Sequence, residues 1–424
     1  MKLKGSFKGV FFNLGLFQFL TFVRRGVFYS FMINYLFLLM GNVTSTASLG
    51  TLNMVASTLG QNLLWGKVSD RYKLRAKLII AGESIAGFAY ILVFFVHKSL
   101  IDMGYSFNAG LSIIFGLSIL EFFWSMSDVG WAALLTDITT PNVRGKIVGI
   151  LNFISSFGRM IGIIFAGVLY AGGEGFRQGT IFFIVTVMLF VGAFIMWVVS
   201  KSTKESSKIA FESRNEKEEF SVGQKIVGDN RKVYRWFLLS LTIIILGASS
   251  LNQVFLLFIT LPEGLNATDL KMSFILTAWT VGGMVASVFS GRLADKIGRT
   301  KVILYGVLLA IATPLLYGFV PNYLLMALVY GLNGVSFWTI QTVGFALAGD
   351  LIASNERGRL LSRYNAVMAL SWGPAGLLVG GPLADTQISL GVSPHSAYVN
   401  VFLFSSFLVA VGAVIFFLKV KYEA

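Results

Sequence analysis

Long apolar segments recur along the whole chain and are separated by short polar connections. Each is long enough to form an α-helix that crosses about 30 Å of hydrocarbon at about 1.5 Å per residue. The segments are rich in Leu, Phe, Gly and Ala and lack the alternation typical of membrane β-strands, so they predict helices. The twelve predicted helices cover residues 10–39, 48–66, 77–97, 109–135, 146–171, 179–199, 235–260, 270–290, 300–320, 323–348, 360–382 and 397–418.

One polar stretch is much longer than the other connections. Residues 200–233 interrupt the apolar pattern, and the part from Lys201 to Glu219 is dense in Ser, Lys and Glu. This composition is typical of a solvated linker. It predicts an N-terminal six-helix bundle at residues 1–199, a cytoplasmic linker at 200–233, and a C-terminal six-helix bundle at 234–424.

Composition agrees with this pattern. Hydrophobic residues make up 55% of the 424 residues and charged residues only 13%, too little charge to cover a soluble protein of this size. The predicted fold class is therefore all-α integral membrane, with twelve transmembrane helices as two six-helix repeats. The chain has no Cys, and no nucleophile–base or metal-ligand spacing is evident. We therefore expect no enzyme, no cofactor and no metal site.

Basic residues lie mainly on one side of the predicted membrane. With an even number of spans, both termini share a side. Of the 34 Lys and Arg residues, the opposite loops hold only Lys98, Arg177 and Lys271, and three arginines lie inside helices. The positive-inside rule then predicts a plasma-membrane protein with both termini in the cytoplasm. The net charge of +14 indicates contact with anionic membrane lipid and not with nucleic acid.

Two polar loops share one pattern of glycine, aspartate and basic residues. Glycine allows two helices to approach closely at a turn, and the aspartate can cap a helix or pair with a basic group. The loops are Gly66-Lys67-Val68-Ser69-Asp70-Arg71-Tyr72-Lys73 and Gly291-Arg292-Leu293-Ala294-Asp295-Lys296-Ile297-Gly298-Arg299-Thr300-Lys301. A second pattern also repeats in register: Asp137, Asn142, Arg144, Gly145 and Asn152 recur as Asp350, Asn355, Arg357, Gly358 and Asn365.

The loop at 291–301 resembles, at nearly every position, the signature loop of the major facilitator superfamily of secondary transporters. The loop at 66–73 resembles it less, because Lys73 and Leu74 stand where the family has Gly and Arg. The resemblance covers essentially the whole chain. It implies two six-helix bundles with alternating access and a cytoplasmic gate formed by Gly66, Asp70, Arg71, Gly291, Asp295, Lys296, Gly298 and Arg299.

Six ionisable residues lie inside the predicted helices, all in the N-terminal half: Arg24, Arg25, Glu83, Glu121, Asp128 and Arg159. Charges in hydrocarbon cost several kcal/mol unless they are paired or hydrated. Counted from the helix ends, the arginines and Glu121 share a level near the midplane.

These residues predict a cavity in which Glu121 and Asp128, two turns apart on one face, carry a proton. Arg24, Arg25 and Arg159 would bind an anionic substrate group there. A static salt bridge between helices is the open alternative. Glu83, closer to a helix end, is expected to be structural.

The C-terminal half offers polar and aromatic candidates for substrate binding, Asn252, Gln253, Trp338 and Gln341. Gln341 is the repeat counterpart of Asp128. Such side chains can hydrogen-bond and stack on a small molecule, although each one taken singly can also be a packing residue.

Together these features predict a monomeric secondary active transporter of a small solute. The lead substrate class is a small organic anion, moved by alternating access with proton coupling. Proton-coupled efflux of hydrophobic compounds is an alternative. A non-transporting membrane sensor or scaffold is an alternative of another class, although a scaffold has no use for charges at the midplane.

Overall fold

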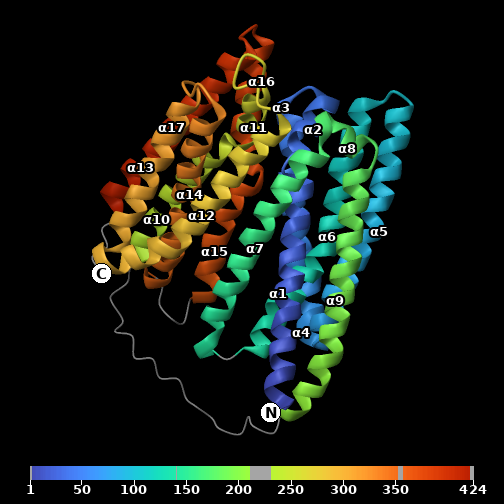
Figure 1. The fold of residues 1–424 in the computed structure, drawn as a ribbon. Helices are drawn as coiled ribbons and strands as arrows, with labels where there is room; N and C mark the ends of the chain where they lie inside the picture. Colours follow the sequence, from blue (N-terminus) through green and yellow to red (C-terminus); the bar gives the residue numbers. More distant parts are fainter. Residues whose placement is uncertain (1, 140, 211–230, 352–356, 421–424) are drawn as a thin grey trace. The chain divides into compact units, whose positions relative to one another are not determined.

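The computed structural model describes residues 2–139, 141–210, 231–351 and 357–420. Residues 211–230 of the predicted linker lie outside the described residues. Every regular element within the described ranges is helical (Figure 1), which agrees with the predicted all-α class.

The helices of the first half follow the predicted segments closely. Their bounds are α1 (Lys2–Tyr29), α2 (Met32–Met40), α3 (Val43–Leu59), α4 (Gly66–Tyr72), α5 (Arg75–Asp102), α6 (Ser106–Ile138), α7 (Pro141–Leu169), α8 (Glu174–Arg177) and α9 (Thr180–Ala210). A π-helical segment, Gly60–Trp65, joins α3 to α4, and a short 3-10 turn, Ala171–Gly173, precedes α8.

The second half continues in the same way. Its helices are α10 (Arg231–Ser250), α11 (Asn252–Thr260), α12 (Asp269–Ile297), α13 (Arg299–Tyr317), α14 (Tyr323–Leu351), α15 (Arg357–Ala369), α16 (Gly381–Ser389) and α17 (Pro394–Lys419). A 3-10 turn, Leu370–Trp372, and a π-helical segment, Gly376–Gly380, lie between α15 and α16.

Nine of the described helical segments are long and apolar enough to cross a membrane by length and composition. They are Arg75–Asp102, Ser106–Ile138, Ile147–Leu169, Thr180–Lys201, Arg231–Thr260, Asp269–Ile297, Arg299–Tyr317, Tyr323–Leu351 and Pro394–Lys419. Each of the remaining predicted spans, 10–39, 48–66 and 360–382, is covered by two or more consecutive helical segments.

The interruptions follow from local sequence. In 360–382 the helix breaks around Gly373-Pro374, because proline has no backbone N–H and its ring clashes with the preceding turn. In 48–66 the π-helical segment begins at Gly60, where a Cβ would come within 2.7 Å of the Phe122 carbonyl oxygen. The Trp65 indole N–H donates to that same oxygen at 2.8 Å. Such π segments are frequent at functional sites.

The helices pack into two compact units, each described by itself. Unit 1 comprises Met1–Tyr29, Val55–Gly162 and Glu174–Lys225. In it α5 packs against α6 and α9, and α1 packs against α9. One apolar core cluster of this unit consists of Val10, Leu14, Phe17, Ile79, Leu134, Ile195, Met196 and Val199. Helix α1 also approaches α7 closely, since a Cβ on Gly26 would lie 2.9 Å from Gly162 Cα.

Unit 2 comprises Ser30–Met54, Ile163–Gly173 and Ile226–Ala424. Helix α14 packs against α12 and α13, and α17 packs against α10 and α13. The unit thus joins two short segments of the first sequence half to the C-terminal helices. The predicted bundles at 1–199 and 234–424 describe the repeat in the sequence, and their bounds stay a prediction.

Polar contacts tie these short segments into unit 2. The Asp385 carboxylate of α16 accepts hydrogen bonds at the start of α3, from Val43 N at 2.9 Å, Thr44 N at 2.8 Å and Thr44 Oγ1 at 2.6 Å. Asn34 Nδ2 of α2 donates to the Leu256 carbonyl at 3.2 Å. Gly172 N donates to Asp269 Oδ2 at 3.0 Å.

Candidate functional site

Five charged side chains gather in the interior of unit 1. Arg24 and Arg25 come from α1, Glu83 from α5, and Glu121 and Asp128 from α6. Arg24 interacts electrostatically with Glu83 and Glu121, and Glu121 interacts with all four of the others. The structure therefore brings together four of the predicted cavity residues with Glu83. We call this group the charged cluster.

Arg24 is the more buried of the two arginines in the cluster. Its side chain is 3% exposed, and its guanidinium carbon is 4.9 Å from the centre of the Trp124 ring. Within the described part of the chain, its Nε and Nη2 have no hydrogen-bond partner. The buried cation is thus balanced by the nearby carboxyl charges and an aromatic face more than by hydrogen bonds.

Arg25 is the more accessible cation. Its side chain is 25% exposed, and Nη2 lies 3.7 Å from Oδ1 of Asp128, whose side chain is 43% exposed. That separation is an ion pair but is too long for a hydrogen bond. The guanidinium also lies over the rings of Trp124 and Phe22, at 4.5 and 5.3 Å from their centres. Arg25 and Asp128 therefore form a loose, partly exposed pair.

Glu83 is held by two donors of α6. It is 1% exposed, and its Oε1 accepts hydrogen bonds from Trp124 Nε1 and Ser127 Oγ, both at 2.8 Å. The sequence predicts a structural role for Glu83 and does not single out Trp124. The signal for Trp124 was its spacing, because it lies three residues after Glu121 and four before Asp128, on one helix face.

Arg159 lies on α7 where this helix packs against α1. Its side chain on α7 is exposed, and its carbonyl oxygen lies against α1, 2.6 Å from where a Cβ on Gly26 would stand. The role of Arg159 in binding an anionic substrate group together with Arg24 and Arg25 stays a prediction. The five residues of the charged cluster carry three carboxyl groups and two guanidinium groups.

Unit 2 contains the uncharged candidates. Gln253 is 9% exposed, and its Oε1 has no hydrogen-bond partner within the described residues. A Cβ on Gly376, the first residue of the π-helical segment, would come within 2.7 Å of Gln253 Cδ. Glycine at this position therefore makes the room that Gln253 occupies. Asn252 is partly buried beside it in the sequence.

Helix α14 contributes the other uncharged candidates, Trp338 and Gln341, both partly buried. The ring of Trp338 lies 6.3 Å from that of Trp279. Trp279 Nε1 donates to Asn333 Oδ1 at 3.2 Å, and Asn333 Nδ2 donates to Thr313 Oγ1 at 3.1 Å. This hydrogen-bonded chain was missed in the sequence, where single polar residues in apolar helices gave no common spacing.

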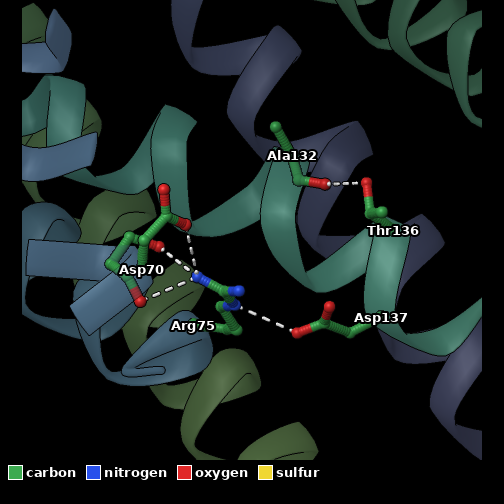
Figure 2. Close-up of polar contacts among 6 residues, drawn as sticks. Asp70, Arg75, Ala132, Thr136 and Asp137 are labelled. Atoms are coloured by element: carbon green, nitrogen blue, oxygen red, sulfur yellow. Dashed lines mark hydrogen bonds and ion pairs between the residues drawn. The ribbon is translucent and has the colours of Figure 1, made fainter. Parts of the chain in front are cut away.

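The first predicted gate loop is organised by an arginine that the sequence pattern did not indicate (Figure 2). Arg75 donates from Nη1 to the Ser69 carbonyl at 2.8 Å and to Ser69 Oγ at 2.7 Å, and from Nε to Asp137 Oδ2 at 3.0 Å. Asp70 is 84% exposed and lies 3.4 Å from Arg75. Gly66 begins α4, and Arg71 lies over the Tyr72 ring.

The second predicted gate loop has the same design. Arg299, at the start of α13, donates to the Ala346 carbonyl at 2.6 Å and pairs with Asp350. Gly298 has φ 94°, a conformation that favours glycine. Gly291, Asp295 and Lys296 lie in the last turns of α12, with both charged side chains exposed. Since Asp137 and Asp350 are repeat counterparts, each half ties its own loop with one arginine and one aspartate.

Comparison with known proteins identifies the family. The chain matches the Major Facilitator Superfamily over residues 14–262 and 238–424. It therefore belongs to the major facilitator superfamily, and the predicted resemblance is confirmed. The chain is a multi-pass membrane protein of this family, and its described helices are consistent with the twelve-helix fold predicted from the apolar segments.

Relatives at the sequence level are distant. An uncharacterized MFS-type transporter of Mycobacterium tuberculosis is 30% identical over 118 residues, which cover 28% of this chain and 17% of that protein. This chain therefore matches under one fifth of that relative's length. A multi-drug resistance efflux pump PmrA homolog of Lactococcus lactis is 23% identical over 343 residues, 80% of this chain and 78% of that protein.

Solved structures show the same fold. A bacterial homologue of the iron transporter ferroportin aligns with a TM-score of 0.69 at 15% identity, covering 97% of this chain and 99% of that chain. The nucleoside transporter NupG aligns with a TM-score of 0.64 at 15% identity, covering 98% and 100%. Identities this low support the fold and carry no substrate to this chain.

Proposed function

We propose that this member of the major facilitator superfamily is a proton-coupled secondary transporter of a small organic anion. The observation that carries the proposal is the loose, partly exposed pair of Arg25 and Asp128 at the edge of the charged cluster. Arg25 would bind the anionic group of the substrate, and Asp128 would take up a proton. We further propose that the protein works as a monomer in the plasma membrane, with both termini cytoplasmic.

Charge balance supports the proton step. If every group in the charged cluster is ionised, the three carboxylates exceed the two guanidinium groups by one. An uncompensated charge in a poorly hydrated site is costly. A proton on one carboxyl group removes that excess, and Asp128 and Glu121 are the predicted carriers. Glu83 already accepts two hydrogen bonds on one oxygen.

The loose pair supports the anion step. Arg25 does not depend on close contact with Asp128, since its guanidinium also rests on two aromatic rings. A substrate carboxylate or phosphate can therefore replace Asp128 as its partner through charge-assisted hydrogen bonds. Protonation of Asp128 favours this exchange, because it removes the competing negative charge. One proton and one negative charge then occupy the site together.

Efflux of hydrophobic compounds is the second candidate. It is favoured by the similarity to the multi-drug resistance efflux pump PmrA homolog. The aromatic group in unit 2 also suits flat apolar molecules, because the rings of Phe337 and Trp338 lie within 6.5 Å of Trp279. In that case the proton carriers would be the same and Arg25 would not bind substrate.

Transport by purified protein in proteoliposomes distinguishes these functions. The panel should contain mono-, di- and tricarboxylates, phosphate esters, lipophilic cations and neutral dyes, each tested with and without a pH gradient. We expect an anion to accumulate only when the gradient is present. Asp128→Asn should abolish accumulation driven by the gradient while exchange of unlabelled for labelled anion survives.

A matched pair of arginines sharpens the test. Arg25→Gln should raise the KM of the transported anion about tenfold or more, equal to about 1.4 kcal/mol. Arg177→Gln is the control, because the side chain of this arginine is 58% exposed and pairs with Glu174, which is not part of the charged cluster. Accumulation of lipophilic cations alone would support efflux instead. If no compound of the panel is transported, the hypothesis of a non-transporting membrane sensor or scaffold is favoured instead.

A further inference from the structure

Trp124 touches three of the charged groups and has a fixed orientation. The residue is 3% exposed, and its Nε1 donates to Glu83 Oε1 at 2.8 Å. Ser127, on the same helix, donates to the same carboxylate oxygen at 2.8 Å. Because burial and this hydrogen bond restrain the ring, the positions of its faces are set by α5 and α6 and not by the arginines.

Both arginines of α1 lie on this ring. The guanidinium carbons of Arg24 and Arg25 are 4.9 and 4.5 Å from its centre. A cation at this distance is attracted by the negative face of the indole, and the attraction grows as water is excluded. The ring therefore stabilises both guanidinium groups where they lie, in addition to the attraction of their carboxylate partners.

The distance between Arg25 and Asp128 shows the effect of this placement. A hydrogen-bonded guanidinium–carboxylate pair has an N···O distance of about 2.7–2.9 Å. Here the distance is 3.7 Å, although both side chains are partly exposed and neither is confined by close burial. The guanidinium of Arg25 thus stays on the indole instead of closing onto the carboxylate.

We propose that Trp124 is a positioning residue that holds Arg25 away from Asp128 and so leaves its N–H donors available to the substrate anion. This inference rests on the proposed function and adds to it the group that sets anion affinity. It assigns Trp124 no contact with the substrate. Without the ring, Arg25 closes onto Asp128, and an anion has to break a hydrogen-bonded pair before it can bind.

Space filling is the competing explanation for Trp124, and Trp131 provides the matched control. Trp131 lies on the same helix and packs on Phe17 with ring centres 5.3 Å apart. It is partly buried and belongs to the surroundings of an apolar core cluster of unit 1. A large side chain is therefore lost in either variant, but only Trp124→Leu removes the ring that supports Arg25.

A double-mutant cycle on thermal unfolding in detergent tests the inference without any ligand. Asp128→Asn should lower the unfolding midpoint only slightly in the wild-type background. It should lower the midpoint clearly more in the Trp124→Leu background, where Arg25 has come to depend on Asp128. In the Trp131→Leu background the effect of Asp128→Asn should equal that in the wild type.

Equal effects of Asp128→Asn in the wild-type and Trp124→Leu backgrounds would overturn the proposal. If Trp124→Leu does not fold, Trp124→Phe replaces it in the cycle. Phenylalanine keeps an aromatic face but lacks the N–H donor, so it should give a smaller coupling of the same sign. A cycle with Trp124→Phe that shows no coupling would then contradict the inference.

Transport supplies the second readout, with the carboxylate that wild-type protein accumulates best as the probe. Trp124→Leu should raise its KM about tenfold, with kcat changed far less, and Trp124→Phe should recover part of the affinity. A loss confined to kcat would contradict the positioning role. If the wild type accumulates no carboxylate, the proposed function fails, and the cycle on unfolding still decides whether Trp124 controls the pair of Arg25 and Asp128.

Discussion

The helices of unit 1 carry charges in their interior, whereas the described charged residues of unit 2 lie in loops and near helix ends. The charged cluster of unit 1 binds together α1, α5 and α6 through ion pairs and an indole. The described interior of unit 2 instead contains hydrogen bonds between neutral groups, such as Trp279 to Asn333. A buried charge without its partner is far more costly than a buried amide without one. The two units therefore differ most in how much each polar side chain contributes to stability.

The largest effect is expected from Glu83, the buried partner of the buried Arg24. Glu83→Ala should lower the free energy of unfolding by about 3–5 kcal/mol, because it removes a buried carboxylate that interacts with Arg24 and leaves the Trp124 and Ser127 donors without their acceptor. Glu83→Gln keeps the shape and should have a smaller effect. Gln253→Ala in unit 2 should change stability far less, since its Oε1 already lacks a partner in the described part. Thermal unfolding in detergent measures all three, and equal shifts for Glu83→Ala and Gln253→Ala would remove the contrast between the units.

A smaller loss of stability is expected at Gly376 in unit 2, where close packing leaves no room for a side chain. Gly376→Ala places a Cβ within 2.7 Å of Gln253 Cδ and should destabilise the protein by about 1–3 kcal/mol. Gln253→Ala in the same chain should restore most of that loss, because it removes the clashing group. Gly349→Ala is the control, as nothing lies within 4 Å of its added Cβ, and it should not destabilise. Failure of the second substitution to rescue Gly376→Ala would show that backbone conformation and not side-chain space requires this glycine.

The smallest effect is expected at the loops, where the two halves are alike. Arg75→Gln and Arg299→Gln should each cost about 1–2 kcal/mol, because each removes hydrogen bonds to a carbonyl and a carboxylate that are only partly shielded from water. The two shifts in unfolding midpoint should be similar. A large effect at Arg299 with none at Arg75 would mean that the two loops, despite their shared pattern, are not equivalent in structure.

The sequence was sufficient for the fold because membrane helices are specified by length and composition, which a pattern of apolar residues records directly. It was also sufficient to find Arg25 and Asp128, since a charge inside an apolar run is conspicuous. It does not determine which face of the bundle each residue occupies, because that depends on how its helix is rotated against its neighbours. Trp124 and Arg75 were missed for a related reason: an indole in an apolar run and an arginine in a polar loop are both ordinary until their partners are known.

The contact between Asp385 and the start of α3 has a consequence for how this part of unit 2 can move. Two neighbouring N–H groups, of Val43 and Thr44, bind the two oxygens of a single carboxylate. This pairing fits one rotation of α3 about its axis, so a slide by one residue would break both bonds and form no equivalent pair. We therefore expect α3 and α16 to be either docked or detached, with no stable intermediate arrangement. Distance measurements on single molecules labelled on α3 and α16 should accordingly give two discrete populations and not a continuous range.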